Sequence, residues 1–114
     1  MIAVVAVQNQ YSIGDRQHED TLEYCERHQI GFIPWFPVAA GKLAKPGGIL
    51  DAAAHKDNVS VAQLALAWPQ HRSPVMLPIP GTSSVKHLEE NAAAASIKLS
   101  AAEWAALEQQ AKAA

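Results

Sequence analysis

The sequence predicts an α/β fold in which parallel strands alternate with helices. Three apolar runs that suit strands each precede a segment that suits a helix, and two helices are expected at the end of the chain. This alternation favours parallel pairing through right-handed crossovers. Groups suited to ligand contact lie at or just after the predicted strand ends: the amides at residues 8–9, Trp-Phe-Pro at residues 35–37 and Gly-Thr-Ser at residues 81–83. That edge of a parallel sheet is where α/β proteins bind ligands.

The first half of the chain predicts two strands around one helix. Residues 2–7 form an unbroken run of β-branched residues and alanines, which suits a strand buried on both faces. A helix is expected from Asp20 to about His28, with Asp20 as its N-cap and Glu23 as the capping-box partner. Gly31 is expected to end this helix, and residues 32–35 predict the second strand.

The middle of the chain predicts a loop over residues 36–48, a short helix over residues 49–55 and a longer helix after Ser60. Ser60 and Gln63 form a capping-box pattern. The apolar positions that follow have helical spacing: Val61, Leu64, Ala65 and Trp68. Pro69 is expected to end or kink this helix, because proline cannot donate to the carbonyl four residues earlier.

The last third predicts a short strand at residues 75–77 and a turn at residues 78–84, which contains two prolines, a glycine and small hydroxyl residues. A helix is expected from about residue 84 to residue 95, and its N-terminus would suit a phosphate group. A capping box at residues 100–103 predicts a final helix that packs Trp104 and Leu107.

Composition limits the classes of protein that fit. The 114 residues are enough for a single small domain, expected over residues 1–114, and the net charge of −2 gives no basic field for nucleic acid. A single cysteine, Cys25, excludes an internal disulfide and fits a reducing, cytoplasmic location. We interpret Cys25 as a residue that packs within a helix. The apolar start is too short to span a membrane and lacks the basic region of a signal peptide.

Four segments occur together in a recognisable order. They are residues 7–12 (VQNQYS), 32–43 (FIPWFPVAAGKL), 62–68 (AQLALAW) and 78–91 (PIPGTSSVKHLEEN). Together they resemble the C-terminal part of an aldo-keto reductase, over essentially the whole chain. The resemblance implies a (β/α)₈ barrel that binds NADP(H) over the carboxyl ends of its strands. The three predicted strands would be the sixth to eighth of that barrel, which is incomplete without the others.

The resemblance also implies roles for individual residues. Gln8 would bind the nicotinamide carboxamide and Trp35 would stack on the nicotinamide ring. The pyrophosphate would lie along the loop that contains Phe36, Pro37, Val38, Gly41 and Leu43. The adenosine phosphate and adenine would meet Gly81, Thr82, Ser83, His87, Glu90 and Asn91.

Each role has a simpler alternative. Trp35 could be a core residue, Gln8 could cap a strand end, and Ser83 or Ser84 could be an ordinary N-cap. Glu90 could belong to a solvated helix face.

The chain departs from the family at three points. The family's catalytic tyrosine, lysine, aspartate and histidine lie in the other half of the barrel, so no catalytic residue is expected here; Tyr11 and Tyr24 do not fit. The five histidines lack metal-ligand spacing, and all but His87 are interpreted as surface residues. NADP is implied, with NAD open, because serines stand at positions 83 and 84 where many relatives have arginine or lysine. Pro69 and the following glutamine stand where relatives have apolar helix formers.

Three hypotheses follow. The first is a partial aldo-keto reductase, inactive alone, that would act on a carbonyl substrate once an N-terminal half, on a separate chain or within a longer protein, completed the barrel. The second is a non-catalytic nucleotide-binding or assembly module, in which two copies pair their open sheet edges. The third is a degraded gene product.

Overall fold

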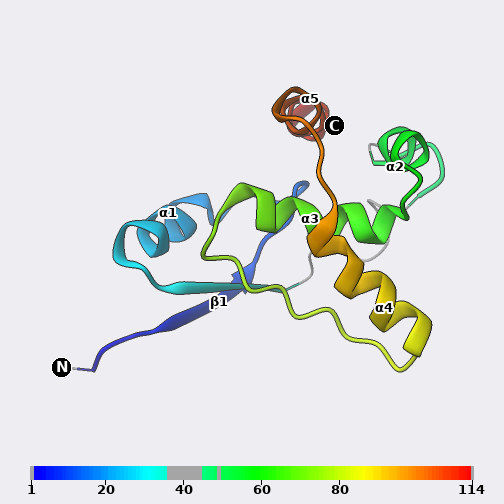
Figure 1. Ribbon diagram of the computed structural model, residues 1–114. Coiled ribbons are helices and arrows are strands. Elements are labelled where there is room, and N and C mark those ends of the chain that lie inside the picture. The colour runs from blue at the N-terminus through cyan, green and yellow to red at the C-terminus, as the bar shows by residue number, and fades with distance from the viewer. Residues whose placement is uncertain (1, 36–44, 49, 114) are drawn as a thin grey trace.

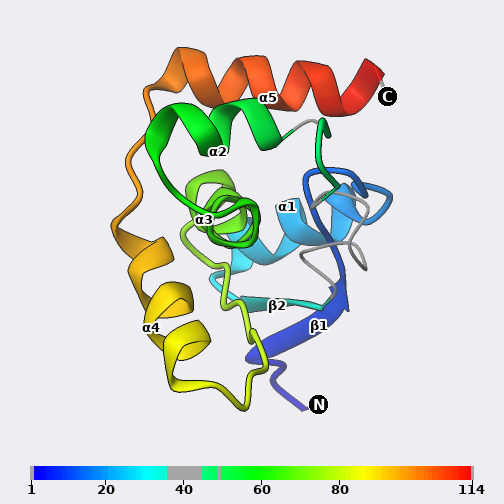
Figure 2. The same cartoon turned by 90° about the vertical axis from the view of Figure 1, so that its right-hand side faces the viewer.

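The computed structural model describes residues 2–35, 45–48 and 50–113. Two parallel strands, β1 (Ala6–Gln10) and β2 (Gly31–Trp35), form an open sheet. The helices among the described residues are α1 (Glu19–His28), α2 (Asp51–Asp57), α3 (Val61–Arg72), α4 (Val85–Ala93) and α5 (Ala101–Ala113), with a short 3₁₀ turn at Ala94–Ser96. Helices α1 and α3 lie on one side of the sheet, and α5 lies beyond α2 and α3 (Figures 1 and 2). The α/β class and the parallel pairing are therefore confirmed.

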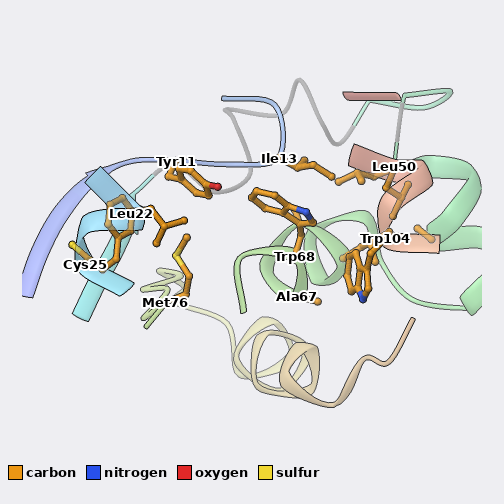
Figure 3. Packing of buried hydrophobic residues seen from close by; sticks show 14 residues of the cluster. Tyr11, Ile13, Leu22, Cys25, Leu50, Ala67, Trp68, Met76 and Trp104 are labelled. Atoms are coloured by element: carbon orange, nitrogen blue, oxygen red, sulfur yellow. The ribbon is translucent and has the colours of Figure 1, made fainter. Parts of the chain in front are cut away.

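The core lies between the sheet and the helices and centres on Trp68 of α3. The Trp68 ring stacks on Tyr11 with a centroid separation of 5.5 Å, and Tyr11 meets Phe32 edge to face at 5.7 Å. Cys25 is buried in the same core, which confirms its interpretation as a packing residue (Figure 3). Trp104 and Leu107 of α5 are buried too, as expected.

The first strand lies later in the chain than predicted. It covers Ala6–Gln10, and Ile2, Val4 and Val5 before it are exposed instead of buried on both faces. The register pairs Ala6 with Gly31, so β2 decides which part of the apolar run becomes strand. The strand predicted at residues 2–7 therefore overlaps β1 at residues 6 and 7 only, and its predicted start and burial were wrong because hydrophobicity alone does not set register.

Two of the three predicted capping boxes are present. Ser60 caps α3 and exchanges backbone and side-chain hydrogen bonds with Gln63, and Ser100 and Glu103 do the same before α5. The box at Asp20 is absent, because α1 begins one residue earlier and Asp20 instead accepts from the N–H of Thr21. That helix ends at Gln29 in a left-handed conformation, with φ of 54°, so Gly31 starts β2 rather than ending α1.

Pro69 does not end α3. The helix runs from Val61 to Arg72 with Pro69 inside it, and the proline ring is fully buried. The carbonyl of Pro69 accepts from the N–H of Ser73, so hydrogen bonding resumes directly after the ring. Burial of the ring in the core offsets the missing donor, a tertiary effect that local sequence rules omit.

The third predicted strand is reduced to an isolated bridge. Phe32 pairs in parallel with Met76, with the N–H of Phe32 donating to Val75 and its carbonyl accepting from Leu77, each at 2.8 Å. The next residue of β2 that faces this segment is Pro34, which has no N–H to continue the ladder. The predicted strand at residues 75–77 therefore becomes a single parallel contact beside β2.

Candidate functional site

The residues predicted at the strand ends gather on one face of the sheet. The register pairs Gln8 with Ile33 and Gln10 with Trp35. Because paired residues of parallel strands point to the same side, these four side chains share a face, opposite the buried Phe32 and Pro34. We call this the open face. Gln8 is exposed and Trp35 is 42% exposed.

The open face extends to the segment beside β2. Met76 pairs with the buried Phe32, which puts the neighbouring Leu77 on the opposite side. A Cβ atom on Gly31 would lie 2.9 Å from Cδ1 of Leu77. The Leu77 side chain therefore packs over Gly31, the one glycine in the two strands. Leu77 and Ile79 are 52% and 58% exposed. Five further predicted contacts lie outside the described residues: Phe36, Pro37, Val38, Gly41 and Leu43.

The turn after this segment leads to the N-terminus of α4. Because Met76 bridges Phe32 in parallel, the chain continues toward the edge where β1 and β2 end, and Figure 1 shows it running on to α4. Gly81, Thr82 and Ser83 are exposed, and a Cβ atom on Gly81 would contact nothing within 4 Å. Small residues thus surround an accessible helix N-terminus.

The N-cap of α4 is Ser84. Its hydroxyl oxygen accepts from the N–H of His87 at 3.4 Å, and its own N–H donates to the Thr82 hydroxyl at 3.1 Å. The alternative interpretation of an ordinary N-cap therefore applies to Ser84 and not to Ser83. The Ser83 side chain stays exposed next to the helix N-terminus.

The remaining predicted contacts lie along α4. His87 and Asn91 are four residues apart, so they share a helix face; His87 is exposed and Asn91 is half-buried. The carbonyl of Glu90 accepts from Nε2 of Gln63 at 2.9 Å, which ties this helix to α3. The Glu90 carboxylate lies 3.8 Å from Nζ of Lys86, so an ammonium group partly offsets its charge beside the turn.

A half-buried polar cluster lies behind the sheet, and its full extent was not predicted from the sequence. The carboxylate of Glu19 accepts from the Tyr11 hydroxyl at 2.5 Å, from Arg16 at 2.9 Å and from Nε of Arg72 at 2.8 Å. Nη1 of Arg72 also donates to Glu26 at 2.9 Å. Only the Arg16–Glu19 spacing was visible in the sequence, since Arg72 comes from a distant helix.

The cluster also excludes Tyr11 as an available proton donor. Burial raises the pKa of Tyr11, and its hydrogen bond to Glu19 raises that pKa further. Burial also raises the pKa of Glu19, but hydrogen bonds from Arg16, Tyr11 and Arg72 outweigh it and bring that pKa down to about 2. The cluster is a fixed ion-pair network that joins α1 to α3.

The described part of the chain contains neither a candidate metal site nor a candidate membrane-spanning helix. No group of three or more His, Cys, Asp or Glu side chains there could hold a metal ion. Three of the histidines interpreted as surface residues are exposed, and His18 is half-buried; His28 stacks on Tyr24 and His71 on Trp104. No helix among the described residues has the length and hydrophobicity needed to cross a membrane.

Comparison with known proteins identifies similar chains. The model of the aldo/keto reductase family matches residues 1–112. An uncharacterized oxidoreductase of Schizosaccharomyces pombe is 55% identical over 109 residues, and pyridoxine 4-dehydrogenase of Escherichia coli is 39% identical over 97. These alignments cover 96% and 85% of this chain but 36% and 34% of the relatives, so the chain spans about a third of their length.

Solved structures give the same result. A thermostable aldo-keto reductase in complex with the inhibitor epalrestat superposes with a TM-score of 0.84 at 30% identity, over 95% of this chain and 40% of its own. An aldo/keto reductase from Klebsiella pneumoniae in complex with NADP and acetate superposes with a TM-score of 0.80 at 33% identity, over 92% and 38%. The structure is thus an α/β fragment of that barrel fold. On these matches, the chain belongs to the aldo/keto reductase family.

Proposed function

We propose that this chain is the NADP(H)-binding side of an aldo-keto reductase barrel and forms one partial barrel domain over residues 1–114. Its strands and the 75–77 segment would be the sixth to eighth strands of the complete barrel. The observation that carries the proposal is the shared open face of Gln8 and Trp35, next to a segment that leads to the N-terminus of α4. The K. pneumoniae reductase, solved with NADP, supports the choice of cofactor.

The residues present fit such a cofactor. The exposed amide of Gln8 offers the donor and acceptor that a carboxamide needs, and the exposed Trp35 ring offers a flat surface for the nicotinamide. Thr82 and Ser83 lie at a helix N-terminus that favours a phosphate, with Lys86 and His87 one turn away. The proposed pyrophosphate contacts are Phe36, Pro37, Val38, Gly41 and Leu43.

In the proposed reaction, this chain binds and orients the cofactor and supplies no acid or base. The bound cofactor supplies the hydride that reduces an aldehyde or ketone. Tyr11 is buried against Glu19 and cannot reach the open face, so the proton donor must come from the rest of the barrel. We therefore expect this chain alone to bind NADPH without turning over a carbonyl substrate.

Intrinsic fluorescence can test binding, because the three tryptophans differ in exposure. Trp35 is 42% exposed, whereas Trp68 and Trp104 are 0% and 3% exposed. Titration with NADPH should quench the emission of Trp35, and W35F should remove most of that quenching. The matched control is Y24F, which changes another half-exposed aromatic ring on α1 and should leave the quenching intact.

Titration with each cofactor in turn tests which of NADPH and NADH this chain binds more tightly. NADPH should bind more tightly than NADH if Ser83, Lys86 and His87 meet the additional phosphate. Calorimetry without any heat of binding at about 1 mM NADPH, the weak end of specific association, would rule the proposal out.

A further inference from the structure

We infer that Gln63 of α3 is a positioning residue for the cofactor, because it holds α4 in the orientation that presents the helix N-terminus to the adenosine phosphate. This inference rests on the proposed function and adds to it a residue that acts through the helix rather than on the cofactor itself. Gln63 lies in the 62–68 segment, which carries part of the family resemblance but none of the predicted contacts. The evidence is the pair of hydrogen bonds that its side-chain amide makes.

The Gln63 amide joins two helices through partners of opposite kind. Its Oε1 accepts from the backbone N–H of Ser60 at 3.0 Å, within the capping box of α3. Its Nε2 donates to the backbone carbonyl of Glu90 in α4 at 2.9 Å. A backbone N–H can only donate and a carbonyl can only accept, so the two partners together fix which way the amide points. One half-buried side chain thereby connects the start of α3 with the second half of α4.

Helix α4 has few other anchors among the described residues. None of its nine residues is buried, and only Glu90 and Asn91 are half-buried. Its C-terminal end continues into the 3₁₀ turn, which contacts α3 and contains the buried Ala94. At its other end, the hydrogen bonds of the N-cap stay within residues 82–87. Figures 1 and 2 show this first turn projecting away from α3.

The direction of α4 therefore depends on contacts in its second half, whereas the proposed phosphate contacts Thr82 and Ser83 lie before its first turn. The helix N-terminus is about 8 Å from Glu90 along the axis, so a rotation there would displace it. The Gln63 bond also holds the backbone next to Asn91, which is a proposed adenine contact. Without this bond α4 would sample several orientations, and the cofactor would lose affinity by having to order the helix.

Three variants separate this positioning role from a contribution to stability alone. Q63E keeps an oxygen that can accept from Ser60, as in the usual capping box, and removes the donor to Glu90. Q63M removes both hydrogen bonds without adding a charge. The matched control S100A removes the hydroxyl that caps α5, in a capping box of the same kind on another helix.

We expect Q63E and Q63M to bind NADPH about fivefold more weakly than the wild type, the factor that corresponds to one net hydrogen bond. Calorimetry with adenosine 2′,5′-bisphosphate, which lacks the nicotinamide, should show the same factor. The maximal quenching of Trp35 by NADPH should not change, because the effect lies at the adenosine end. All three variants should lower the urea midpoint, Q63M more than Q63E, but S100A should keep its NADPH affinity within about twofold of the wild type.

Hydrogen exchange of the chain without cofactor gives a second measurement. The backbone amides of α4 should exchange about fivefold faster in Q63E than in the wild type, since the helix opens more often once its bond to α3 is lost. The amides of α5 should change less in Q63E. In S100A the faster exchange should occur in the first turn of α5, with α4 unaffected.

Equal NADPH affinity in the wild type, Q63E and Q63M would overturn the inference and leave the proposed function standing. An equal loss of affinity in S100A would also overturn it, because binding would then follow overall stability. Unchanged exchange of α4 in Q63E would show that the bond does not hold the helix. If the wild type bound neither NADPH nor the bisphosphate, the proposed function would fail, and faster exchange in Q63E would then mark Gln63 as a structural residue only.

Discussion

At the scale of single residues, the carboxylate of Glu19 joins three segments of the chain that no sequence motif links. Its carboxylate accepts from Tyr11 beyond β1, from Arg16 in the following loop and from Arg72 at the end of α3. The Arg16 guanidinium also lies 5.2 Å from the centre of the Trp68 ring, over the core. One carboxylate thus fixes the loop that follows β1 relative to the helices behind the sheet.

We predict that E19Q destabilises the chain by about 1–3 kcal/mol, the range for hydrogen bonds to a charged group. The lower end is expected, because the Glu19 side chain is 25% exposed and water screens the interaction. Urea unfolding measures the change. E23Q on the exposed side of the same helix is the control and should stay within about 0.5 kcal/mol. Equal midpoints for the two variants would contradict the role of Glu19.

The burial of a residue could be predicted where it depends on neighbouring residues in the sequence. Contacts with a partner far away in the sequence could not. The burial of Cys25 and Trp104 followed from their helical spacing. The stacking of Trp68 on Tyr11 and the ion pair of Arg72 with Glu19 join residues more than fifty positions apart. No spacing rule within one helix or strand reports such pairs.

At the scale of elements, two of the three capping boxes predicted from four consecutive residues are present, and the one at Asp20 is absent. Ser60–Gln63 and Ser100–Glu103 form their reciprocal bonds within the chain segment that encodes them. The limits of β1 and the loss of the third strand depend on partners, since Gly31 sets the register and Pro34 withholds a donor. Strand prediction failed there because pairing is a property of two segments.

The two serines before α4 give a prediction about that element. Ser84 caps the helix, so S84A should cost about 0.5–2 kcal/mol of stability. Ser83 is exposed and does not cap, so S83A should keep the stability and weaken NADPH binding if its hydroxyl meets a phosphate. Thermal unfolding and NADPH titration of both variants separate the roles. Weaker folding in S83A rather than S84A would reverse the assignment.

At the scale of the whole molecule, charged contacts join the helices across the outer layer. Glu108 of α5 accepts from Nε1 of Trp68 at 3.0 Å and lies 3.5 Å from Arg16, while Lys56 of α2 pairs with Glu103 of α5. The sheet side has no comparable network among the described residues; it presents the open face. Charged contacts therefore hold the helices to one another, whereas one face of the sheet is uncovered among the described residues.

Acid should loosen this helical layer. Hydrogen bonds lower the pKa of Glu19 to about 2 despite its burial, and the bond from Lys56, assisted by Ser100, brings the pKa of Glu103 to about 2 as well. Their ordinary value is 4.5, so both pKa values are depressed in the folded chain. Such groups stabilise the fold above the unfolded pKa, and that stabilisation is lost as the pH falls from about 4.5 toward 2.

We therefore expect the urea midpoint of the wild-type chain to fall steadily over that pH range. E19Q has already lost one of the two titrating contacts, so its midpoint should start lower at pH 7 and decline less steeply below pH 4.5. The curves of the two proteins should approach one another toward pH 2, where about half of wild-type Glu19 is protonated. Parallel curves from pH 7 to pH 2 would mean that Glu19 has the same pKa in the folded and unfolded chain, and the cluster behind the sheet would then contribute no acid sensitivity.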